Sequence, residues 1–443
     1  MTRPFKVGVA LAAGLGAAIR LVTLQTVAAR NPDGFGDPAY YHEQAKMLVG
    51  GQGFGEPFRW TRLHLLVPSA SHPPLYTIWL AIPSALGFDS WTDHKLMTCL
   101  AGVLTVVVIA LVGREVAGDR AGIIAAVVAA AYPNFWMIDG ILMPEGLFTL
   151  AIAGCLWLAY RWRRSPRWGW AAALGAGIAL AALTRGEAVL LLALLVLPLV
   201  ALRPQLTAAQ KLRTLAVAGA ATLVVLAPWM IRNYGAFHNF VPLSNNSNEV
   251  IYYANCPDTY SGRLMGFWSF PCQARDRIAH GEPPGDESDK ALYWRKKGIR
   301  YALDHKGRVP VVVAARMGRM WDVYRPFQNA EFTKVEGRTE WVSDVGLIYY
   351  WAMLPAAAVG LVVLRRRRVS VVPLVAMAAL VTLTAVYAYG AVRFRTPADV
   401  AIAVLVGVAA DGALRRWRHR PGQAGDFGAD AQAGEMTRAQ ERR

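Results

Sequence analysis

The residues best suited to chemistry are carboxylates beside long apolar runs. Asp37 precedes Pro38 in a polar stretch after the first apolar run, and Glu145 follows Pro144 at the start of a later one. A carboxylate fixed at such a place can accept a proton from a hydroxyl group within hydrogen-bond reach. Each acid could instead cap or charge the N-terminus of a helix, where Asp and Glu are also favoured. The local sequence leaves both interpretations open.

Basic residues near the ends of other apolar runs could bind an anion. His72 is followed by two prolines, which restrict the backbone and would hold the imidazole in a defined place. Arginine binds phosphate through two parallel hydrogen bonds. The arginines at the ends of apolar runs are Arg185, Arg232, Arg393 and Arg395. The alternatives are a histidine in a surface turn and arginines whose side chains only reach the membrane surface.

Together these residue types suit transfer of a group from a phosphate-linked carrier to an activated hydroxyl. The sequence has no Walker loop, GxGxxG, HExxH or paired CxxC motif, so no nucleotide or structural metal is indicated. No cofactor is expected to be required. A divalent metal remains possible, since Asp37, Glu145 and His72 are residue types that bind such ions.

The composition places these residues in a membrane protein. Of the 443 residues, 55% are hydrophobic and 17% are charged, whereas soluble domains have about 25% charged residues. The net charge of +17 alone would suggest nucleic-acid binding, but the long uncharged runs argue against it. Four cysteines are too few for a disulfide-dense secreted scaffold. The composition therefore excludes a soluble enzyme and a disordered chain.

The apolar runs predict an all-α polytopic membrane protein with about ten transmembrane helices. A helix needs about 17–25 mostly apolar residues to cross a bilayer. The predicted spans are 7–29, 96–112, 121–138, 146–160, 169–184, 188–202, 214–231, 344–364, 369–390 and 397–413.

The charges between the spans predict the orientation. The short loops and the C-terminal tail are basic and hold most of the excess charge, and short basic loops stay in the cytoplasm. Both termini are then cytoplasmic in a plasma (inner) membrane, and the long segments 30–95 and 232–343 are extracytoplasmic. The first apolar run is expected to be retained rather than cleaved as a signal peptide, because Arg20 interrupts it.

Four regions follow from this topology. Residues 1–231 would form an N-terminal transmembrane module, with 30–95 as its first outer loop. The block 232–343 is long enough for an extracytoplasmic domain or loop with juxtamembrane helices. Residues 344–414 would form the C-terminal transmembrane helices. Gly, Ala, Gln and scattered charges in 415–443 predict a disordered cytoplasmic tail.

Two cysteines of the outer block are expected to pair. Cys256 and Cys272 would face an oxidising compartment, where disulfides form. The alternative is a pair of buried thiols. Cys99 and Cys155 lie within predicted spans and are expected to be packing residues.

Short motifs recur in a fixed order along the chain. They are Asp37-Pro38-Ala39-Tyr40-Tyr41, Gly50-Gly51-Gln52-Gly53-Phe54, His72-Pro73-Pro74-Leu75-Tyr76, Pro144-Glu145-Gly146-Leu147-Phe148, Leu183-Thr184-Arg185-Gly186-Glu187, Pro228-Trp229-Met230-Ile231-Arg232-Asn233-Tyr234 and Arg393-Phe394-Arg395-Thr396-Pro397. In this order they resemble the GT-C superfamily of membrane glycosyltransferases. The branch with protein O-mannosyltransferases and the lipid A aminoarabinose transferase is the most similar. The block 232–343 matches no motif of that branch.

The resemblance implies two catalytic carboxylates. Asp37 matches the catalytic Asp of the first outer loop in this family. Many members have an Asp-Glu dipeptide there, whereas this chain has Asp37-Pro38. The second carboxylate would then be Glu145, which matches the second acidic position. Tyr40 and Tyr41, in the same motif as Asp37, are expected to contact the substrate.

The resemblance also implies a group that binds the phosphate of a polyprenyl-phosphate sugar donor. His72 stands where the lipid A enzyme has a phosphate-contacting Lys, and Arg232 matches a region that supplies a phosphate-binding Arg. Arg393 and Arg395 match a basic pair near the last span. The expected function is an inverting transfer of a sugar, either mannose or a pentose, to a hydroxyl of a protein, lipid or glycan outside the membrane.

Two other functions fit parts of the sequence. A transporter or flippase would explain many spans and the intramembrane Arg20, but it predicts inverted repeats with broken helices, which the sequence lacks. A non-catalytic scaffold that binds a partner through 232–343 leaves the ordered motifs unexplained. The sequence identifies neither the sugar nor the acceptor.

Overall fold

The computed structural model describes residues 1–27 and 36–418. Within these ranges the chain is helical, and the one β-type contact is an isolated bridge between Gly55 and Pro68. The predicted all-α class is therefore confirmed. The last helix continues to Arg418, beyond the expected start of a disordered tail at 415. Residues 419–443 of that predicted tail lie outside the described ranges.

Five helical segments in the described ranges are long and apolar enough to cross a membrane. They are α1 (Arg3–Thr26), α5 (Trp91–Ala117), α11 (Ala208–Ala236), α18 (Glu340–Arg366) and the segment Val392–Trp417, which contains α20 (Thr396–Arg418). A sixth span is possible from α6 (Asp119–Ala131) and α7 (Pro133–Asp139), which meet at a bend of 57°. A proline at the start of α7 accounts for the bend, because proline cannot continue the hydrogen-bond ladder of α6.

Shorter helices complete the bundle. They are α8 (Glu145–Arg164), α9 (Trp168–Ala182), η2 (Gly186–Leu190), η3 (Leu192–Val196), α10 (Leu197–Ala201) and α19 (Val372–Tyr387). Each of the ten predicted spans coincides with one helix or with consecutive short helices. The multi-pass membrane fold is therefore confirmed, whereas the count of ten spans stays a prediction.

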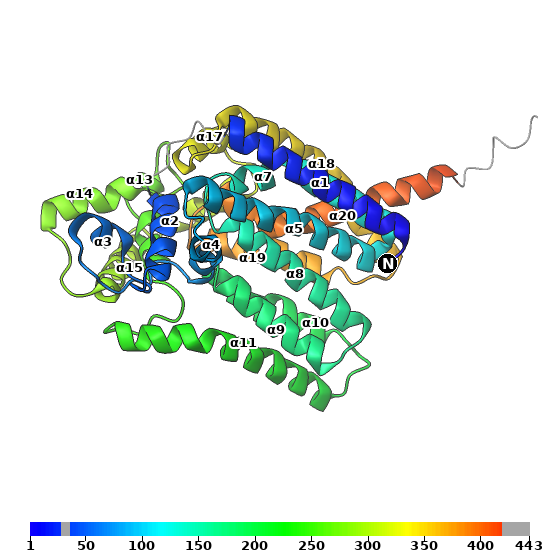
Figure 1. Ribbon diagram of the computed structural model, residues 1–443, viewed down its shortest axis with the longest axis horizontal. Helices are drawn as coiled ribbons and strands as arrows, with labels where there is room; N and C mark the ends of the chain where they lie inside the picture. Colours follow the sequence, from blue (N-terminus) through cyan, green and yellow to red (C-terminus); the bar gives the residue numbers. More distant parts are fainter. Residues whose placement is uncertain (28–35, 419–443) are drawn as a thin grey trace, which may run out of the picture.

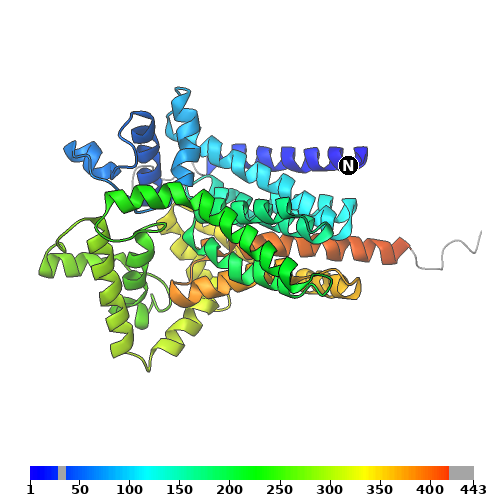
Figure 2. The ribbon, with the colours of Figure 1, turned by 90° about the horizontal axis from the view of Figure 1, so that it is seen from below.

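The helices separate into two zones along the long axis of the molecule (Figure 1). The long helices run side by side, and the N-terminal end of α1 and the C-terminal end of α20 lie at the same end of the bundle. Figure 2 shows the same separation from below, with the connecting helices gathered at the opposite end. The start of α1 and the end of α20 thus lie at one end of the bundle and most of the helices from 30–95 and 232–343 at the other. Which end faces the cytoplasm stays a prediction from the charge pattern.

We call the end of the bundle opposite to the start of α1 the connecting end. Its helices come from two segments of the chain. The first segment holds α2 (Gly36–Val49), α3 (Pro57–Leu63) and α4 (Leu75–Ala85). The second holds α12 (Asn246–Ala254), α13 (Pro257–Tyr260), α14 (Phe270–His280), α15 (Glu287–Asp304), α16 (Val309–Met320), α17 (Pro326–Phe332) and η4 (Thr333–Glu336). A last short turn, η5 (Val392–Arg395), leads directly into α20.

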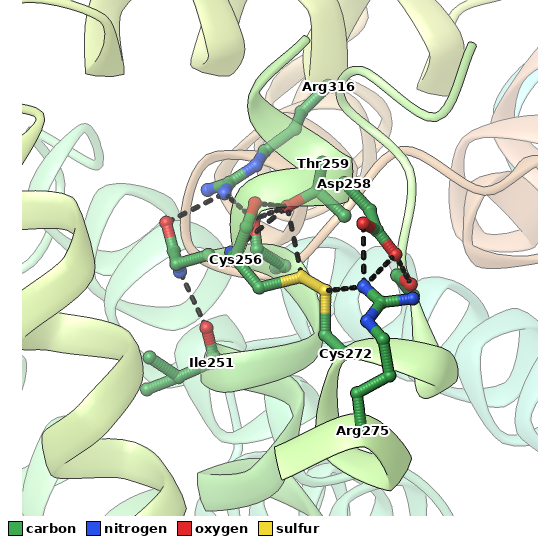
Figure 3. The surroundings of a disulfide bond; sticks show 10 residues. Ile251, Cys256, Asp258, Thr259, Cys272, Arg275 and Arg316 are labelled. Carbon is green, nitrogen blue, oxygen red and sulfur yellow. Dashed lines mark hydrogen bonds and ion pairs between the residues drawn. A yellow bond between two sulfur atoms is a disulfide. The ribbon is translucent and has the colours of Figure 1, made fainter. Parts of the chain in front are cut away.

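A disulfide and an aromatic core hold part of the second segment. Cys256 and Cys272 are bonded, with their Cα atoms 6.4 Å apart. Their bridge packs with the buried rings of Tyr252 and Trp294, and arginines lie on either side of it (Figure 3). This small core links α12, α14 and α15. The other two cysteines, Cys99 and Cys155, are free and buried, which agrees with a packing role.

Candidate active site

Asp37 lies in the first turn of α2 at the connecting end of the bundle. Its side chain is 40% exposed, and it faces two basic residues from distant parts of the chain. Its Oδ1 is 3.6 Å from Nε2 of His72, and its Oδ2 is 3.9 Å from Nη1 of Arg393. Asp37 is thus a carboxylate that is reachable from solvent and bordered by groups able to bind a phosphate.

Arg393 lies at the centre of this cluster. Its guanidinium is 3.2 Å from Glu336 and 3.7 Å from Glu145, measured from Nε to each carboxylate. Its Nη2 also donates to the hydroxyl of Tyr389 at 3.1 Å. The residue stands in η5, immediately before α20. It therefore joins α2, α8, η4 and the start of the last span through one cation.

Glu145 begins α8 and is fully buried. One carboxylate oxygen, Oε1, accepts a hydrogen bond from Arg185 at 2.5 Å. The other oxygen, Oε2, is buried with no hydrogen-bond partner among the described residues. Arg185 also pairs with Glu187 at 2.6 Å. The structure thus brings Asp37 and Glu145 near each other, with Arg393 between the two carboxylates.

His72 is held by the two tyrosines of the first motif. The ring centroids of Tyr40 and Tyr41 each lie 4.8 Å from that of His72. Both tyrosines are buried, and the Tyr40 hydroxyl is 2.8 Å from Ser69 Oγ. Burial lowers the pKa of His72 below its ordinary value, although Asp37 opposes this shift. The two tyrosines therefore pack against the imidazole of His72, and their contact with the substrate stays a prediction.

Arg232 lies apart from this cluster. Its guanidinium donates to the carbonyl of Ser69 at 3.0 Å and to that of Phe54 at 2.6 Å. It also packs over the ring of Trp229, 5.1 Å from the centroid. These contacts attach the first outer loop to the end of α11. The structure does not bring Arg232 to Asp37 or Arg393.

Arg395 lies on the other side of η5 from Arg393, in a separate buried network. Its guanidinium is 2.6 Å from Asp322 and 3.0 Å from Asp399. A further nitrogen lies 3.2 Å from the hydroxyl of Tyr132. The two arginines, two positions apart in sequence, thus face different partners, and Arg395 has its donors occupied by protein groups.

Two charged residues of the cluster were not anticipated from the sequence. Glu336 lies between Arg393 and Arg338, and its distance to Arg338 Nε is 3.5 Å. Arg338 is buried and donates to Asn134 in α7 at 2.9 Å. Its Nη2 has no hydrogen-bond partner among the described residues. The one available signal was the run of alternating charges, Lys334 to Glu340, just before an apolar span.

Comparison with known proteins supports a family assignment for part of the chain. Residues 71–231 match the family described as dolichyl-phosphate-mannose-protein mannosyltransferase. This segment contains His72, Glu145 and Arg185 of the cluster. No curated protein matches the chain.

Solved structures share the fold at low sequence identity. An oligosaccharyltransferase of Archaeoglobus fulgidus, tethered to an acceptor peptide containing the NVT sequon, has a TM-score of 0.56 and 15% identity, over 94% of this chain and 50% of that chain. AglB of the same organism, in complex with an inhibitory peptide and a dolichol-phosphate, has a TM-score of 0.54 and 14% identity. The match covers 99% of this chain and 54% of that chain. The chain thus spans about half the length of these proteins.

A third likeness is weaker. ArnT from Cupriavidus metallidurans, bound to undecaprenyl phosphate, has a TM-score of 0.42 and 17% identity, over 89% of this chain and 77% of that chain. That score is too low to show a shared fold. The oligosaccharyltransferase likeness and the family match together confirm the GT-C resemblance at the level of fold.

The cluster does not offer a ready site for a divalent metal. The Archaeoglobus fulgidus oligosaccharyltransferase has also been crystallised with Zn and sulfate. Here the guanidinium of Arg393 stands between Asp37 and Glu145, 3.9 Å and 3.7 Å from them, where a bridging cation would have to bind. A separate exposed group, His238 with Asp286 and Asp289, has its ligand atoms within 4.8 Å of one another. It lies at the start of α15, where the two acids form a capping box.

Proposed function

We propose that this chain is a GT-C membrane glycosyltransferase that transfers a sugar from a polyprenyl-monophosphate donor to a hydroxyl acceptor. The family match over residues 71–231 and the shared fold support this proposal. The observation that carries the proposal is the placement of Arg393 against Asp37. A buried cation able to bind phosphate lies 3.9 Å from a carboxylate that is partly open to solvent. The transfer needs a cation beside the phosphate leaving group and a base beside the acceptor hydroxyl, and the two must lie close together.

Arg393 and His72 would bind the donor phosphate. The pKa of His72 is lowered by burial, so its imidazole is neutral near pH 7 and can donate one hydrogen bond. Arg393 supplies the positive charge, and buried charges act strongly because little water screens them. Arg338, whose Nη2 lacks a protein partner, is a further donor near the same carboxylates. In this proposal Arg232 and Arg395 stabilise the fold around the site.

Asp37 would act as the general base. Its carboxylate accepts the proton of the acceptor hydroxyl as the oxygen attacks the anomeric carbon of the donor sugar. The bond between that carbon and the phosphate oxygen breaks, and the electron pair leaves with the polyprenyl phosphate. Arg393 stabilises the negative charge on that phosphate, so no general acid is required. One displacement inverts the anomeric configuration.

Glu145 would position the cations rather than exchange protons. It is buried and hydrogen-bonded to Arg185, and it lies 3.7 Å from Arg393. A carboxylate so placed orients Arg393 toward Asp37. The second catalytic carboxylate expected from the sequence is therefore assigned here an electrostatic role.

The side of the membrane, the sugar and the acceptor also belong to the proposal. Helix α2, which carries Asp37, lies at the end of the bundle opposite to the start of α1 (Figure 1). With the basic loops and the N-terminus in the cytoplasm, the reaction would take place outside it. The matched family is described by a mannose donor and a protein acceptor, which favours mannose over a pentose. The acceptor peptide tethered to one of the similar proteins also favours a peptide as acceptor, and the proposal adds that the accepting group is a hydroxyl.

A transfer assay tests this function. Membranes with the wild-type chain are incubated with radiolabelled polyprenyl-phosphate mannose and, separately, polyprenyl-phosphate pentose. We expect labelled product from one donor and at least a hundredfold loss for Asp37→Asn, in line with loss of a general base. Glu43→Gln, on the same helix and paired with Lys46, is the matched control and should retain transfer.

The alternative function predicts another result. A flippase or transporter would move the labelled lipid across the membrane without a covalent product. Absence of product with every donor, together with movement of the lipid, would replace the transferase proposal. Near-wild-type transfer by Asp37→Asn would remove Asp37 from the role of base.

A further inference from the structure

A second ion pair lies among the helices of the bundle. Nε of Arg20 in α1 is 2.7 Å from Oδ2 of Asp139 at the end of α7, and both side chains are almost fully buried. Arg20 Nη1 also donates to the carbonyl of Gly16 at 3.1 Å. Charged residues within a membrane are costly and are usually retained for function. The proposed transfer reaction does not itself use this pair.

Two glycines leave room for the pair. A Cβ atom on Gly102 would lie 1.9 Å from Oδ2 of Asp139 and 2.5 Å from Nε of Arg20. A Cβ atom on Gly146 would lie 2.5 Å from Oδ1 of Asp139. These helices, α5 and α8, thus approach the pair so closely that a methyl group would displace it. The pair is enclosed on the sides of four different helices.

The pair connects the two segments that carry the site carboxylates. Asp139 ends α7, and Glu145 begins α8 after the turn 140–144. Leu142 in this turn is buried and has a φ of 50°, which is uncommon for a leucine and requires support from its surroundings. On the other side of the pair, α1 leads along the chain to α2 and Asp37.

We propose that Arg20 and Asp139 are positioning residues that set the Glu145 turn, and with it Arg393, relative to Asp37. The pair fixes α1 against the end of α7, and Gly146 transmits the position of Asp139 to the first turn of α8. This inference rests on the proposed function for its effect on rate. The effect of the ion pair on the position of the turn 140–144 does not depend on the proposed function.

The kinetic test uses three variants of the full chain in lipid nanodiscs. Arg20→Met and Asp139→Asn each break the pair, and Arg20→Met with Asp139→Leu replaces it by apolar groups. A displacement of about 1 Å in a reacting group can reduce the rate by about a hundredfold. We expect each variant to lose at least tenfold in kcat, and KM for the donor should rise as well because Arg393 also binds the donor phosphate.

The double variant separates positioning from folding. Replacement of a buried ion pair by apolar residues is often neutral or stabilising, so this variant should fold even where the single variants do not. A folded double variant with low kcat supports positioning. A folded double variant with wild-type kcat would overturn it, because the pair would then serve stability alone.

A labelling experiment reports on the turn without any activity. The thiol of Cys99 is 3.8 Å from the carbonyl oxygen of Asp139, and both free cysteines are buried. Movement of the turn should increase labelling of Cys99 by a membrane-permeant maleimide in Arg20→Met, while Cys155 stays protected. Unchanged protection of Cys99 in all three variants would contradict the inference, even if the wild type transfers no sugar.

The glycines provide a second test with matched controls. Gly102→Ala and Gly146→Ala should reduce kcat, because each added methyl group collides with the pair. Gly14→Ala in α1 and Gly154→Ala in α8 have open space around the new Cβ atom and should behave like wild type. Wild-type kcat in both Gly102→Ala and Gly146→Ala would count against the pair as a positioning device.

Discussion

Glu336 lies 3.2 Å from Nε of Arg393, closer than either Glu145 or Asp37 does. The same carboxylate also contacts Arg338. Its single negative charge is therefore shared between two buried guanidinium groups. Arg338 Nη2 has no hydrogen-bond partner among the described residues, so Glu336 can hold both arginines in place while this donor is left to bind an anion.

Neutralising Glu336 should separate donor binding from catalysis. In Glu336→Gln the donor phosphate meets more net positive charge, so KM for the donor should fall. Arg393, freed from Glu336, should turn toward Asp37 and stabilise its negative charge, so Asp37 becomes a weaker base. We therefore expect kcat to fall about tenfold, which corresponds to about 1.4 kcal/mol in the activation free energy. Steady-state kinetics with the donor identified in the transfer assay measure both.

A neighbouring acid is the control for this change. Glu340 pairs with Lys334 at the surface, and its side chain is 44% exposed. Glu340→Gln should leave both constants near wild type, because exposed pairs contribute little. Equal effects of the two substitutions would refute a specific role for Glu336.

Arg393 and Arg395 should respond differently to substitution. Arg395→Met leaves Asp322 and Asp399 buried without their partner, which typically destabilises a protein by about 3–5 kcal/mol. Arg393→Lys keeps the charge and should fold normally, but it should raise KM for the donor because the guanidinium geometry is lost. Thermal unfolding and donor kinetics measure the two effects, and a stable Arg395→Met with raised KM would reverse the assignment.

Part of the cluster could be predicted from the sequence, where its residues lie at or just before the start of a helix. Asp37, Glu145 and His72 each stand next to a proline and an apolar run, so their approximate depth followed from local pattern. Arg232 and Arg395 were expected at the same site, but in the structure they contact other partners. The type of a residue and its depth do not tell on which side of a helix its side chain lies. Glu336 was missed because its contacts with Arg393 depend on packing between segments far apart in the chain.

The fold shows the same limit. Ten apolar runs located ten helical segments, because apolar composition determines which residues can face lipid. The break between α6 and α7, the 3₁₀ and π turns before α10, and the helices α3 and α4 of the first long loop were not predicted. They depend on how neighbouring helices satisfy backbone groups, which a hydropathy pattern does not contain.

Acid should destabilise the protein through His42 in α2. Burial, and secondarily the neighbouring His94, lowers the pKa of His42 from 6.5 to about 3. The unfolded chain therefore binds a proton more readily than the folded chain below pH 6.5. Stability is fully present above that pH and falls as the pH decreases toward about 3. The melting temperature measured between pH 7 and pH 5 should decrease.

A phenylalanine at position 42 tests the source of this effect. The His42 ring stacks on Trp91, with centroids 4.0 Å apart, so His42→Phe keeps an aromatic contact and removes the titration. The variant should show a smaller decrease in melting temperature over the same pH range. An identical decrease in both proteins would assign the effect to other groups.

Reduction of the disulfide should loosen the outer helices near Arg393. The bridge closes residues 257–271 into a loop, and Gly266 in that loop accepts a hydrogen bond from the amide of Gly390 at 2.9 Å, three residues before Arg393. Arg316 further fixes the loop end by donating to Asn255 at 2.9 Å (Figure 3). In the chain-entropy model a loop of about 15 residues contributes about 3 kcal/mol.

The double substitution Cys256→Ser with Cys272→Ser should therefore lower the melting temperature in nonreducing buffer. Dithiothreitol should bring the wild type down to the same value and leave the variant unchanged, because the variant has no bridge to reduce. Cys155→Ala, at a free buried cysteine, is the control for loss of a sulfur atom and should keep its response to the reductant. A wild type that is insensitive to dithiothreitol while fully reduced would show that the bridge adds no stability, because the helices around Tyr252 and Trp294 then hold the loop by packing alone.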